Sequence, residues 1–182
     1  GQDDIKSLYT FMENFANHRK IDASLINYQQ VDINNVISEE VNKLKAQIQK
    51  QNINVRRSPY YGPLLISDKK AIHRIVRHLL TNSIDFCDRT KDIKYIEIII
   101  SNTENEIQIS IEDNGLGIAE KEQQLIFTMF YSTKKEDISN GLGLYETNVA
   151  VKKLGGTLTA TSQKGEGTTM KVSIPLNKKE QN

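Results

Sequence analysis

Three glycine-bearing segments of the sequence could bring backbone N–H groups close to an anionic ligand. They are residues 113–117 (DNGLG), 140–143 (NGLG) and 165–167 (GEG). Because glycine has no Cβ and adopts positive φ at little cost, its N–H can approach a ligand closely. The second segment leads into a predicted helix at Leu144, and helix N-termini attract phosphate through unpaired N–H groups and a partial positive charge. Together the segments favour phosphate binding, although each one alone is typical of an ordinary turn.

The acid that begins the first segment also ends a strand-like run. In residues 106–113 (EIQISIED) isoleucines alternate with polar residues, the pattern of a half-buried strand, and the run stops at Asp113. No Lys-Ser or Lys-Thr pair follows the glycines, so this is not the phosphate loop of the common nucleotide hydrolases. The glycine spacing also differs from the Gly-x-Gly-x-x-Gly of dinucleotide-binding folds. These observations leave a ligand site with a carboxylate at the end of a strand.

A second set of polar residues shares one face of a predicted helix. His78, Asn82, Asp85 and Arg89 follow one another at intervals of four, three and four residues, which places them on one stripe. The amide oxygen of Asn82 is a neutral ligand suited to a magnesium ion that keeps several waters and also contacts phosphate oxygens. Without the glycine segments the stripe would be interpreted as a solvated helix face. Together with them it favours a site for magnesium and phosphate.

The elements that must position these residues are predicted from hydrophobic periodicity and from capping and turn residues. Asp32 is the expected N-cap of the first helix below, and Asp68 or Ser67 that of the second. Helices are expected over residues 33–51, 68–88, 120–128 and 144–154, and strands over 53–55, 95–101, 106–114, 157–162 and 168–175. The order indicates an α+β fold: a two-layer α/β sandwich with a mixed, mostly antiparallel sheet and helices on one face, preceded by an amphipathic N-terminal helix.

Composition excludes several classes of protein. The 24 Lys and Arg residues nearly balance the 23 Asp and Glu residues, and no basic cluster is interleaved with aromatics, so nucleic-acid binding is not expected. The longest apolar run, near residues 98–100, is too short to span a membrane, and no signal peptide is visible. The single Cys87 excludes an internal disulfide and fits a reducing compartment, and zinc-ligand spacings are absent. We therefore expect a cytoplasmic location.

Five motifs in order resemble the ATPase superfamily that joins gyrase, the heat-shock chaperone, MutL and bacterial sensor histidine kinases (the GHKL class). HRIVRHLLTNSIDF resembles its Asn box, DNGLGI its first glycine box and IFTMFYSTK the kinase Phe box. NGLGLYETNVAVKKLGG resembles the second glycine box and GEGTTMKVSIPL the closing strand. The match covers about residues 31–177 and implies the Bergerat-type ATP-binding fold, with ATP and Mg²⁺ as ligands.

The resemblance implies a role for each matching residue. Asp113 would accept a hydrogen bond from the adenine amino group and reject guanine, whose oxygen a carboxylate repels; Thr168 would assist through water. Asn82 would hold Mg²⁺, and the N–H groups of Gly141, Gly143 and Leu144 would contact the phosphates. Residues 131–143 would form a lid over the nucleotide. The remaining nucleotide-binding residues implied are Gly115, Gly117, Ile118, Phe130, Lys134, Asn140 and Leu142.

Two positions depart from the family pattern. Where the hydrolase members carry a glutamate that activates water, this chain has His78, which favours phosphoryl transfer over ATP hydrolysis; His78 and Asn82 are the expected catalytic residues. Where the kinases often carry a basic residue after the Asn box, this chain has Asp85. Arg89, Lys91 or Lys134 could supply the missing phosphate contact, or Asp85 could pair with Arg89 on the surface.

The upstream segment also resembles the kinases. Residues 1–30 are similar to the end of a dimerisation helix, residues 31–178 would be the ATP-binding catalytic domain and residues 179–182 a tail. His18 lacks the acid-aliphatic-basic pattern of a phosphoacceptor. The resemblance therefore implies a sensor histidine kinase domain that phosphorylates a histidine on an upstream dimerisation helix absent from this chain.

The implied partners are that helix, the receiver domain of a response regulator and, as a homodimer, a second copy of the chain. The full-length protein could be anchored to a membrane. Two alternatives remain open: a catalytically degenerate nucleotide-binding module that regulates a partner, and a serine kinase of the anti-sigma type, although those kinases carry Glu where His78 stands.

Overall fold

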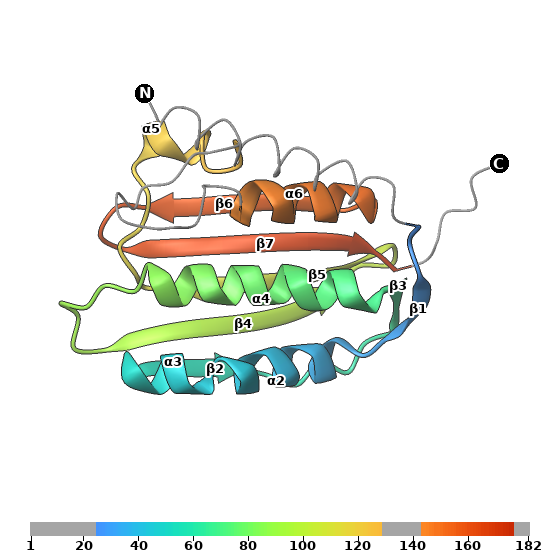
Figure 1. Ribbon diagram of the computed structural model, residues 1–182, viewed down its shortest axis with the longest axis horizontal. Helices are drawn as coiled ribbons and strands as arrows, with labels where there is room; N and C mark the ends of the chain where they lie inside the picture. The colour runs from blue at the N-terminus through green and yellow to red at the C-terminus, as the bar shows by residue number, and fades with distance from the viewer. Residues whose placement is uncertain (1–24, 129–142, 177–182) are drawn as a thin grey trace, which may run out of the picture.

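The computed structural model describes residues 25–128 and 143–176, which form a five-stranded sheet with helices on one face and a two-stranded sheet at one end (Figure 1). The elements in chain order are β1 Tyr28–Val31, α2 Ile33–Lys43, α3 Lys45–Lys50, β2 Ile53–Arg57, β3 Leu65–Asp68, α4 Lys69–Asp85, β4 Lys94–Asn102, β5 Glu106–Asp113, α5 Glu120–Gln123, α6 Gly143–Lys153, β6 Thr157–Gln163 and β7 Gly167–Pro175.

The main sheet has the strand order β2-β4-β5-β7-β6. β2 and β4 are parallel, and the other neighbouring strands are antiparallel. β5 is the central strand, and its register sets Asp113 opposite Thr168 of β7 on one side and Ile96 of β4 on the other. This arrangement confirms the predicted α+β sandwich with a mixed, mostly antiparallel sheet.

The core lies between the sheet and the helix layer. In Figure 1, α4 crosses in front of the middle of the sheet, α6 covers the β6 and β7 edge, and α2 with α3 covers the β2 edge. Along β5, side chains alternate between buried and half-buried positions, so one face packs on the helices. α4 buries one apolar stripe against that face: Ile72, Ile75, Val76, Leu79, Leu80 and Ile84. The alternation along β5 is the two-residue period of a strand, and the stripe on α4 is the 3.6-residue period of a helix; both are visible in the sequence.

Helix caps hold α2 and α4 where the sequence predicts them. The Asp32 carboxylate accepts hydrogen bonds from the N–H groups of Asn34 (2.9 Å) and Asn35 (3.4 Å). Asp68, rather than Ser67, caps α4 and accepts a 3.0 Å hydrogen bond from Ala71 N–H. Each cap satisfies N–H groups that the first helical turn leaves unpaired.

Several predicted bounds differ from the structure. The expected helix over residues 33–51 is interrupted at Leu44, whose ψ of 3° separates α2 from α3. α4 ends at Asp85 instead of residue 88, and the helix expected over residues 120–128 keeps only the four residues of α5. Residues 28–30, the end of the dimerisation segment expected over 1–30, belong to β1, which pairs with β3, and residues 1–24 of that segment lie outside the described residues. The pairing of β1 with β3 is long-range, and local periodicity does not encode it.

A buried acid joins α2 to α4. Glu40 is fully buried, and its carboxylate accepts hydrogen bonds from Arg77 (2.7 and 3.0 Å) and Lys43 (3.1 Å) and lies 2.8 Å from His73 Nδ1. Burial by itself would raise the pKa of Glu40, but the hydrogen bonds from Arg77, His73 and Lys43 together outweigh it and hold the pKa at about 2. The sequence analysis did not identify this residue.

We expect Glu40→Gln to lower the free energy of unfolding at neutral pH by about 3 kcal/mol, because the fully buried carboxylate is the shared partner of Arg77, Lys43 and His73 and a neutral amide cannot replace its charge. The pKa in the folded state lies below the value of 4.5 of the free side chain. The contribution of Glu40 is therefore complete above that value and disappears as the pH falls toward 2. Urea unfolding of the variant and wild type at pH 7 and pH 3 measures both effects. Glu39→Gln, at a 54% exposed side chain 3.6 Å from His73 Nε2, is the matched control and should change stability little.

Within the described parts of the chain, no helix is long and apolar enough to cross a membrane.

Candidate functional site

Asp113 is a buried carboxylate at the end of the central strand. It is 6% exposed, and its Oδ1 accepts a 2.9 Å hydrogen bond from Gly115 N–H. Burial raises the pKa of Asp113 above its usual value, and this effect exceeds the opposing hydrogen bonds from the backbone of Gly115 and Thr168. Within residues 25–128 and 143–176 no cation pairs with Asp113, and a buried acid of this kind is costly to the fold, which makes Asp113 a candidate site residue.

Ser83, on α4, is the one buried polar side chain in the described residues whose oxygen has no hydrogen-bond partner. It is 1% exposed and interacts with the Asp113 carboxylate closely enough to lower the pKa of that acid, but its Oγ forms no hydrogen bond of acceptable geometry. Buried hydroxyl groups are normally paired with protein or water. An unsatisfied hydroxyl beside a buried carboxylate fits a site that a polar ligand or an ordered water completes.

Thr168 lies opposite Asp113 and is held by a second serine. Ser162 Oγ donates to Gly167 O (2.9 Å), so in the 2.8 Å contact between Ser162 Oγ and Thr168 Oγ1 the threonine is the donor. Ser162 Oγ also accepts a 2.8 Å hydrogen bond from Ile118 N–H. One hydroxyl therefore fixes Thr168 and Ile118 together and leaves the Thr168 oxygen as an acceptor.

The glycines near Asp113 are required by the close approach of protein segments. A Cβ on Gly115 would lie 2.3 Å from Phe86 O and 2.8 Å from Asp113 Oδ1. Gly117 has φ +65°, and a Cβ there would lie 1.9 Å from Gln163 O. The sequence interpretation assigned these two glycines to the ligand. In the structure the space that they leave is filled by the end of α4, by the Asp113 carboxylate and by β6.

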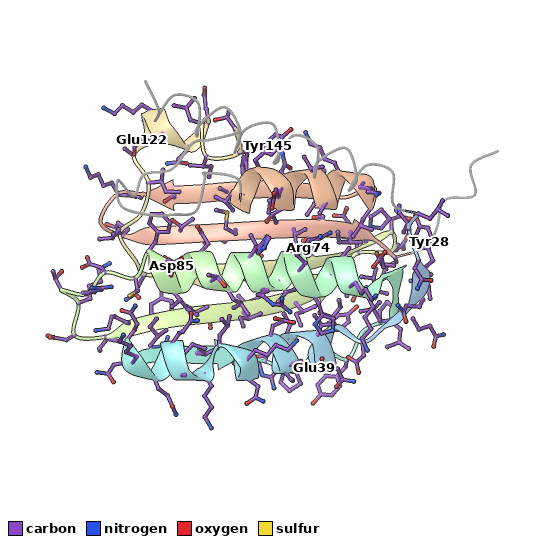
Figure 2. The ribbon with its side chains drawn as sticks, in the orientation of Figure 1. Tyr28, Glu39, Arg74, Asp85, Glu122 and Tyr145 are labelled. Carbon is purple, nitrogen blue, oxygen red and sulfur yellow. The ribbon has the colours of Figure 1, made fainter. Side chains whose placement is uncertain are left out.

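His78 connects α4 to the start of α6. Thr147 Oγ1 donates to Gly143 O (2.6 Å) and is 3.0 Å from His78 Nδ1, so the imidazole donates from Nδ1 and its Nε2 is unprotonated when the ring is neutral. Burial lowers the pKa of His78, the charge of Glu146 raises it in part, and Arg74 lowers it further. Arg74, labelled in Figure 2, is on the side of α4 that lines a small hollow with His78 and Glu146. His78 is therefore neutral at pH 7.

α6 begins at Gly143, where the sequence predicts contacts to phosphate. Leu144 is half-buried against the core, whereas a Cβ on Gly143 would meet no atom of the described residues within 4 Å. The predicted nucleotide-binding residues Phe130, Lys134, Asn140, Gly141 and Leu142 lie outside the described residues.

The two predicted polar ligands near the end of α4 differ in their surroundings. Asn82 is half-buried, and no hydrogen bond of its side-chain amide is found within residues 25–128 and 143–176. Asp85, labelled in Figure 2 at the C-terminal end of α4, lines a hollow with Lys50 and Arg89 on the α3 side. Arg89 lies beyond the end of α4, so the predicted stripe of four residues is shorter than expected.

Lys91, one candidate for a phosphate contact, is engaged elsewhere. Its ammonium group donates to backbone carbonyls of the loop after β5 and of the turn between β6 and β7. In the parts of the chain that the structure describes, no group of three or more His, Cys, Asp and Glu side chains could hold a metal ion. A magnesium site at Asn82 would therefore rely on the amide and on ligand oxygens.

Comparison with known proteins decides the family. The sequence profile described as histidine kinase-, DNA gyrase B-, and HSP90-like ATPase matches residues 67–178, more than half of the chain. The chain belongs to this family. The match includes α4, β5, α6 and β7, the elements that carry the site residues. The predicted resemblance to this ATPase superfamily is confirmed.

Individual members of the family agree with the assignment. The signal transduction histidine-protein kinase ArlS of Staphylococcus haemolyticus is 31% identical over 162 residues, which cover 84% of this chain and 34% of ArlS. The catalytic domain of the histidine kinase ThkA has a TM-score of 0.72 at 21% identity, covering 82% of this chain and 96% of that domain. Full-length ShkA in complex with AMPPNP has a TM-score of 0.73 at 20% identity, covering 84% of this chain and 32% of ShkA. The chain spans about a third of the length of ArlS, and therefore corresponds to one part of such a protein.

Three site residues escaped the sequence analysis. Ser83 follows the predicted ligand Asn82 directly, but serine in a helix gives no sign that it will be buried without a partner. Ser162 and Thr147 matter only through their side-chain hydrogen bonds, to Thr168 and His78 respectively, which the sequence does not reveal. Their burial is the property that distinguishes them, and burial is known only from the structure.

Proposed function

We propose that this domain binds Mg·ATP and transfers the γ-phosphoryl group to a histidine on a dimerisation helix, as the catalytic domain of a sensor histidine kinase. The observation that carries the proposal is Asp113, a 6% exposed carboxylate opposite Thr168 and beside the unsatisfied hydroxyl of Ser83. Family membership and the AMPPNP bound to the structural neighbour ShkA support the choice of an adenine nucleotide.

The residues near Asp113 fit the adenine base. The carboxylate would accept a hydrogen bond from the adenine amino group, and Thr168 Oγ1, whose proton is given to Ser162, would accept from a water that bridges to the base. Guanine carries an oxygen in place of that amino group, which would face the carboxylate without a donor. Rejection of a base that leaves a buried polar group unpaired can reach ~10⁴-fold.

The phosphate end would be held by the start of α6 and by α4. The N–H groups of Gly143 and Leu144 and the partial positive charge of the helix would contact phosphate oxygens, and the Asn82 amide would hold Mg²⁺. Bound Mg·ATP supplies the phosphoryl group: the bond from Pγ to the bridging oxygen breaks, a bond to an imidazole nitrogen forms, and ADP leaves. His78 stands where the hydrolase members of the family carry the glutamate that activates water, so transfer should be favoured over hydrolysis.

The wider assignment rests on the relatives. Residues 31–178 would be the catalytic domain, residues 1–30 the end of the dimerisation segment and residues 179–182 a tail. The phosphorylated helix, the receiver domain of a response regulator and a second copy of the chain would be its partners, in the cytoplasm. ArlS and ShkA are about three times as long as the part that this chain matches. This supports the proposal that the phosphorylated helix lies on another segment of a longer protein.

A transfer experiment tests the proposal. The chain is mixed with radiolabelled Mg·ATP and a separate dimerisation helix pair that carries the acceptor histidine. We expect acid-labile, base-stable label on that helix. Asn82→Ala should reduce the transfer rate on the order of 10²-fold, because the metal ligand that positions the phosphates is gone, and the magnesium dependence of ATP binding should disappear with it.

Asp92→Asn, at an exposed acid in the loop after α4, is the control and should leave the rate unchanged. ATP binding without label on the helix would contradict the kinase assignment and favour a regulatory module. Label on serine would favour the anti-sigma type of kinase.

A further inference from the structure

Lys91 joins two loops that the sheet does not connect. Its Nζ lies 2.7 Å from Asn114 O and 3.5 Å from Gly115 O in the loop after β5. The same atom lies 2.9 Å from Gly165 O and 3.3 Å from Glu166 O in the turn between β6 and β7. An ammonium group has three N–H donors and no acceptor. Four carbonyl oxygens therefore surround one cation that closes the end of the sheet.

The loop that carries Lys91 is itself held in place. Asp88 Oδ1 accepts hydrogen bonds from Thr90 N–H (2.9 Å) and Thr90 Oγ1 (2.6 Å), and Lys91 N–H donates to Asp88 O (3.2 Å). On the other side, Asn114 bonds to the chain just after Lys91: its Oδ1 accepts from Tyr95 N–H (2.9 Å) and its Nδ2 donates to Ile93 O (2.8 Å). Lys91 thus starts from a fixed backbone.

The two loops that Lys91 joins flank the proposed base-binding pair. Asn114 and Gly115 directly follow Asp113, and Gly165 and Glu166 directly precede Gly167 and Thr168. The ladder of β5 and β7 pairs Asp113 with Thr168 as its last step. Beyond that step the loops are tied by Lys91 and by the 2.7 Å hydrogen bond from Gly165 N–H to Leu116 O.

From this geometry we infer that Lys91 is a positioning residue that sets selectivity for the adenine amino group. The inference rests on the proposed function. Lys91 does not touch the base: it draws the two loops together and so fixes the Asp113 carboxylate against Thr168. Without the cation, the four carbonyl oxygens repel one another and turn toward water, and Gly115, whose N–H holds Asp113 Oδ1, moves with them. The strand ladder remains, so the fold survives while the carboxylate loses its alignment.

The test compares ATP with inosine triphosphate (ITP), in which an oxygen replaces the adenine amino group. Calorimetry gives the Kd of each nucleotide for the wild type, Lys91→Met and the control Lys164→Met, which removes an exposed lysine of the same β6–β7 turn. We expect the preference of Lys91→Met for ATP over ITP to fall about tenfold, since a displacement near 1 Å suffices for such a loss. The Kd for ITP should stay within about twofold, since ITP makes no use of the carboxylate alignment.

The ratio of the Kd for ITP to the Kd for ATP distinguishes a specific effect on the Asp113 carboxylate from a general loss of stability. If Lys91→Met weakens ATP and ITP equally, or leaves the ratio at the wild-type value, the inference is wrong. If Lys91→Met does not fold, Lys91→Gln, whose amide keeps two donors, decides by the same ratio. A wild-type protein that binds neither nucleotide overturns the proposed function and this inference together, whereas wild-type selectivity for ATP with an unaltered ratio in the variants overturns the inference alone.

Discussion

Asp113→Asn abolishes binding of adenine nucleotides and at the same time makes the free domain more stable at neutral pH. Gly115 N–H requires the one remaining side-chain oxygen, so the new amide NH₂ faces the amino group of the base, donor against donor. The loss of affinity should be on the order of 10³-fold, the size expected when a buried hydrogen-bond pair is mismatched. Calorimetry with Mg·ATP measures it.

The stability effect follows from the raised pKa of Asp113. A folded-state pKa above the unfolded value means that the contribution of Asp113 to stability is complete below the unfolded pKa and is lost as the pH rises through the folded pKa. At pH 7, well above the unfolded pKa, the burial of this acid therefore opposes folding, and a neutral amide relieves this. Thermal unfolding should show a higher Tm for Asp113→Asn at pH 7, with the advantage disappearing near pH 3.

Asp92→Asn is the control for the chemistry of the substitution, because Asp92 is an exposed acid. It should change neither the Kd nor the Tm. A folded Asp113→Asn protein with wild-type affinity for ATP would remove Asp113 from the base-binding role, whatever its stability.

The sequence predicted the fold because its signals are local. α4 displays one apolar stripe and a capping Asp68, β5 alternates strictly, and Gly155 with φ +79° follows α6 as a helix stop. Such patterns predict the type of each element and its place in a sandwich. They do not predict which strands pair, which is why β1 and its partner β3 were missed. Helix ends also differ by several residues, because periodicity indicates the type of an element better than its bounds.

Within the candidate site, the sequence identified residue types with evident chemistry, such as Asp113, Asn82 and the glycines. It missed Glu40 and assigned Lys91 to phosphate, because both residues act through distant partners. Glu40 bonds to Arg77 across 37 positions and Lys91 to Gly165 across 74. A glutamate on a helix or a lysine in a loop is ordinary on local grounds, so only folding reveals that one is fully buried and the other surrounded by carbonyl oxygens.

The role of the glycines also depends on distant parts of the chain. Glycine in a loop could make room for a ligand or for another segment of the protein. At positions 115 and 117 the structure brings protein backbone within 2.3 Å of where a Cβ would stand, while at Gly143 no atom of the described residues lies within 4 Å of that point. Of these, only the glycine at the start of α6 keeps the property that the sequence suggested for all of them.

Gly167→Ala should destabilise the domain more than any other glycine substitution in the β6–β7 turn. Gly167 has φ +140°, and a Cβ there would lie 1.9 Å from Asp113 O and 2.8 Å from Asn114 Cα. Both are backbone atoms at the last paired step of β5 and β7, so neither can move without opening that end of the ladder. We expect the free energy of unfolding to fall by about 3 kcal/mol, from backbone strain at positive φ plus displacement of the packed loop, and ATP binding to be lost with it.

Gly165→Ala is the matched control that separates strain from contact. Gly165 also has positive φ (+85°) and lies in the same turn, but a Cβ there would meet no atom within 4 Å. It should cost about 1 kcal/mol from the left-handed conformation alone and leave the Kd for ATP close to wild type. Urea unfolding and calorimetry on the two variants give the difference directly. Equal losses in both would mean that the close approach of Gly167 to Asp113 does not hold the carboxylate in place, and that the end of β5 is positioned by the ladder alone.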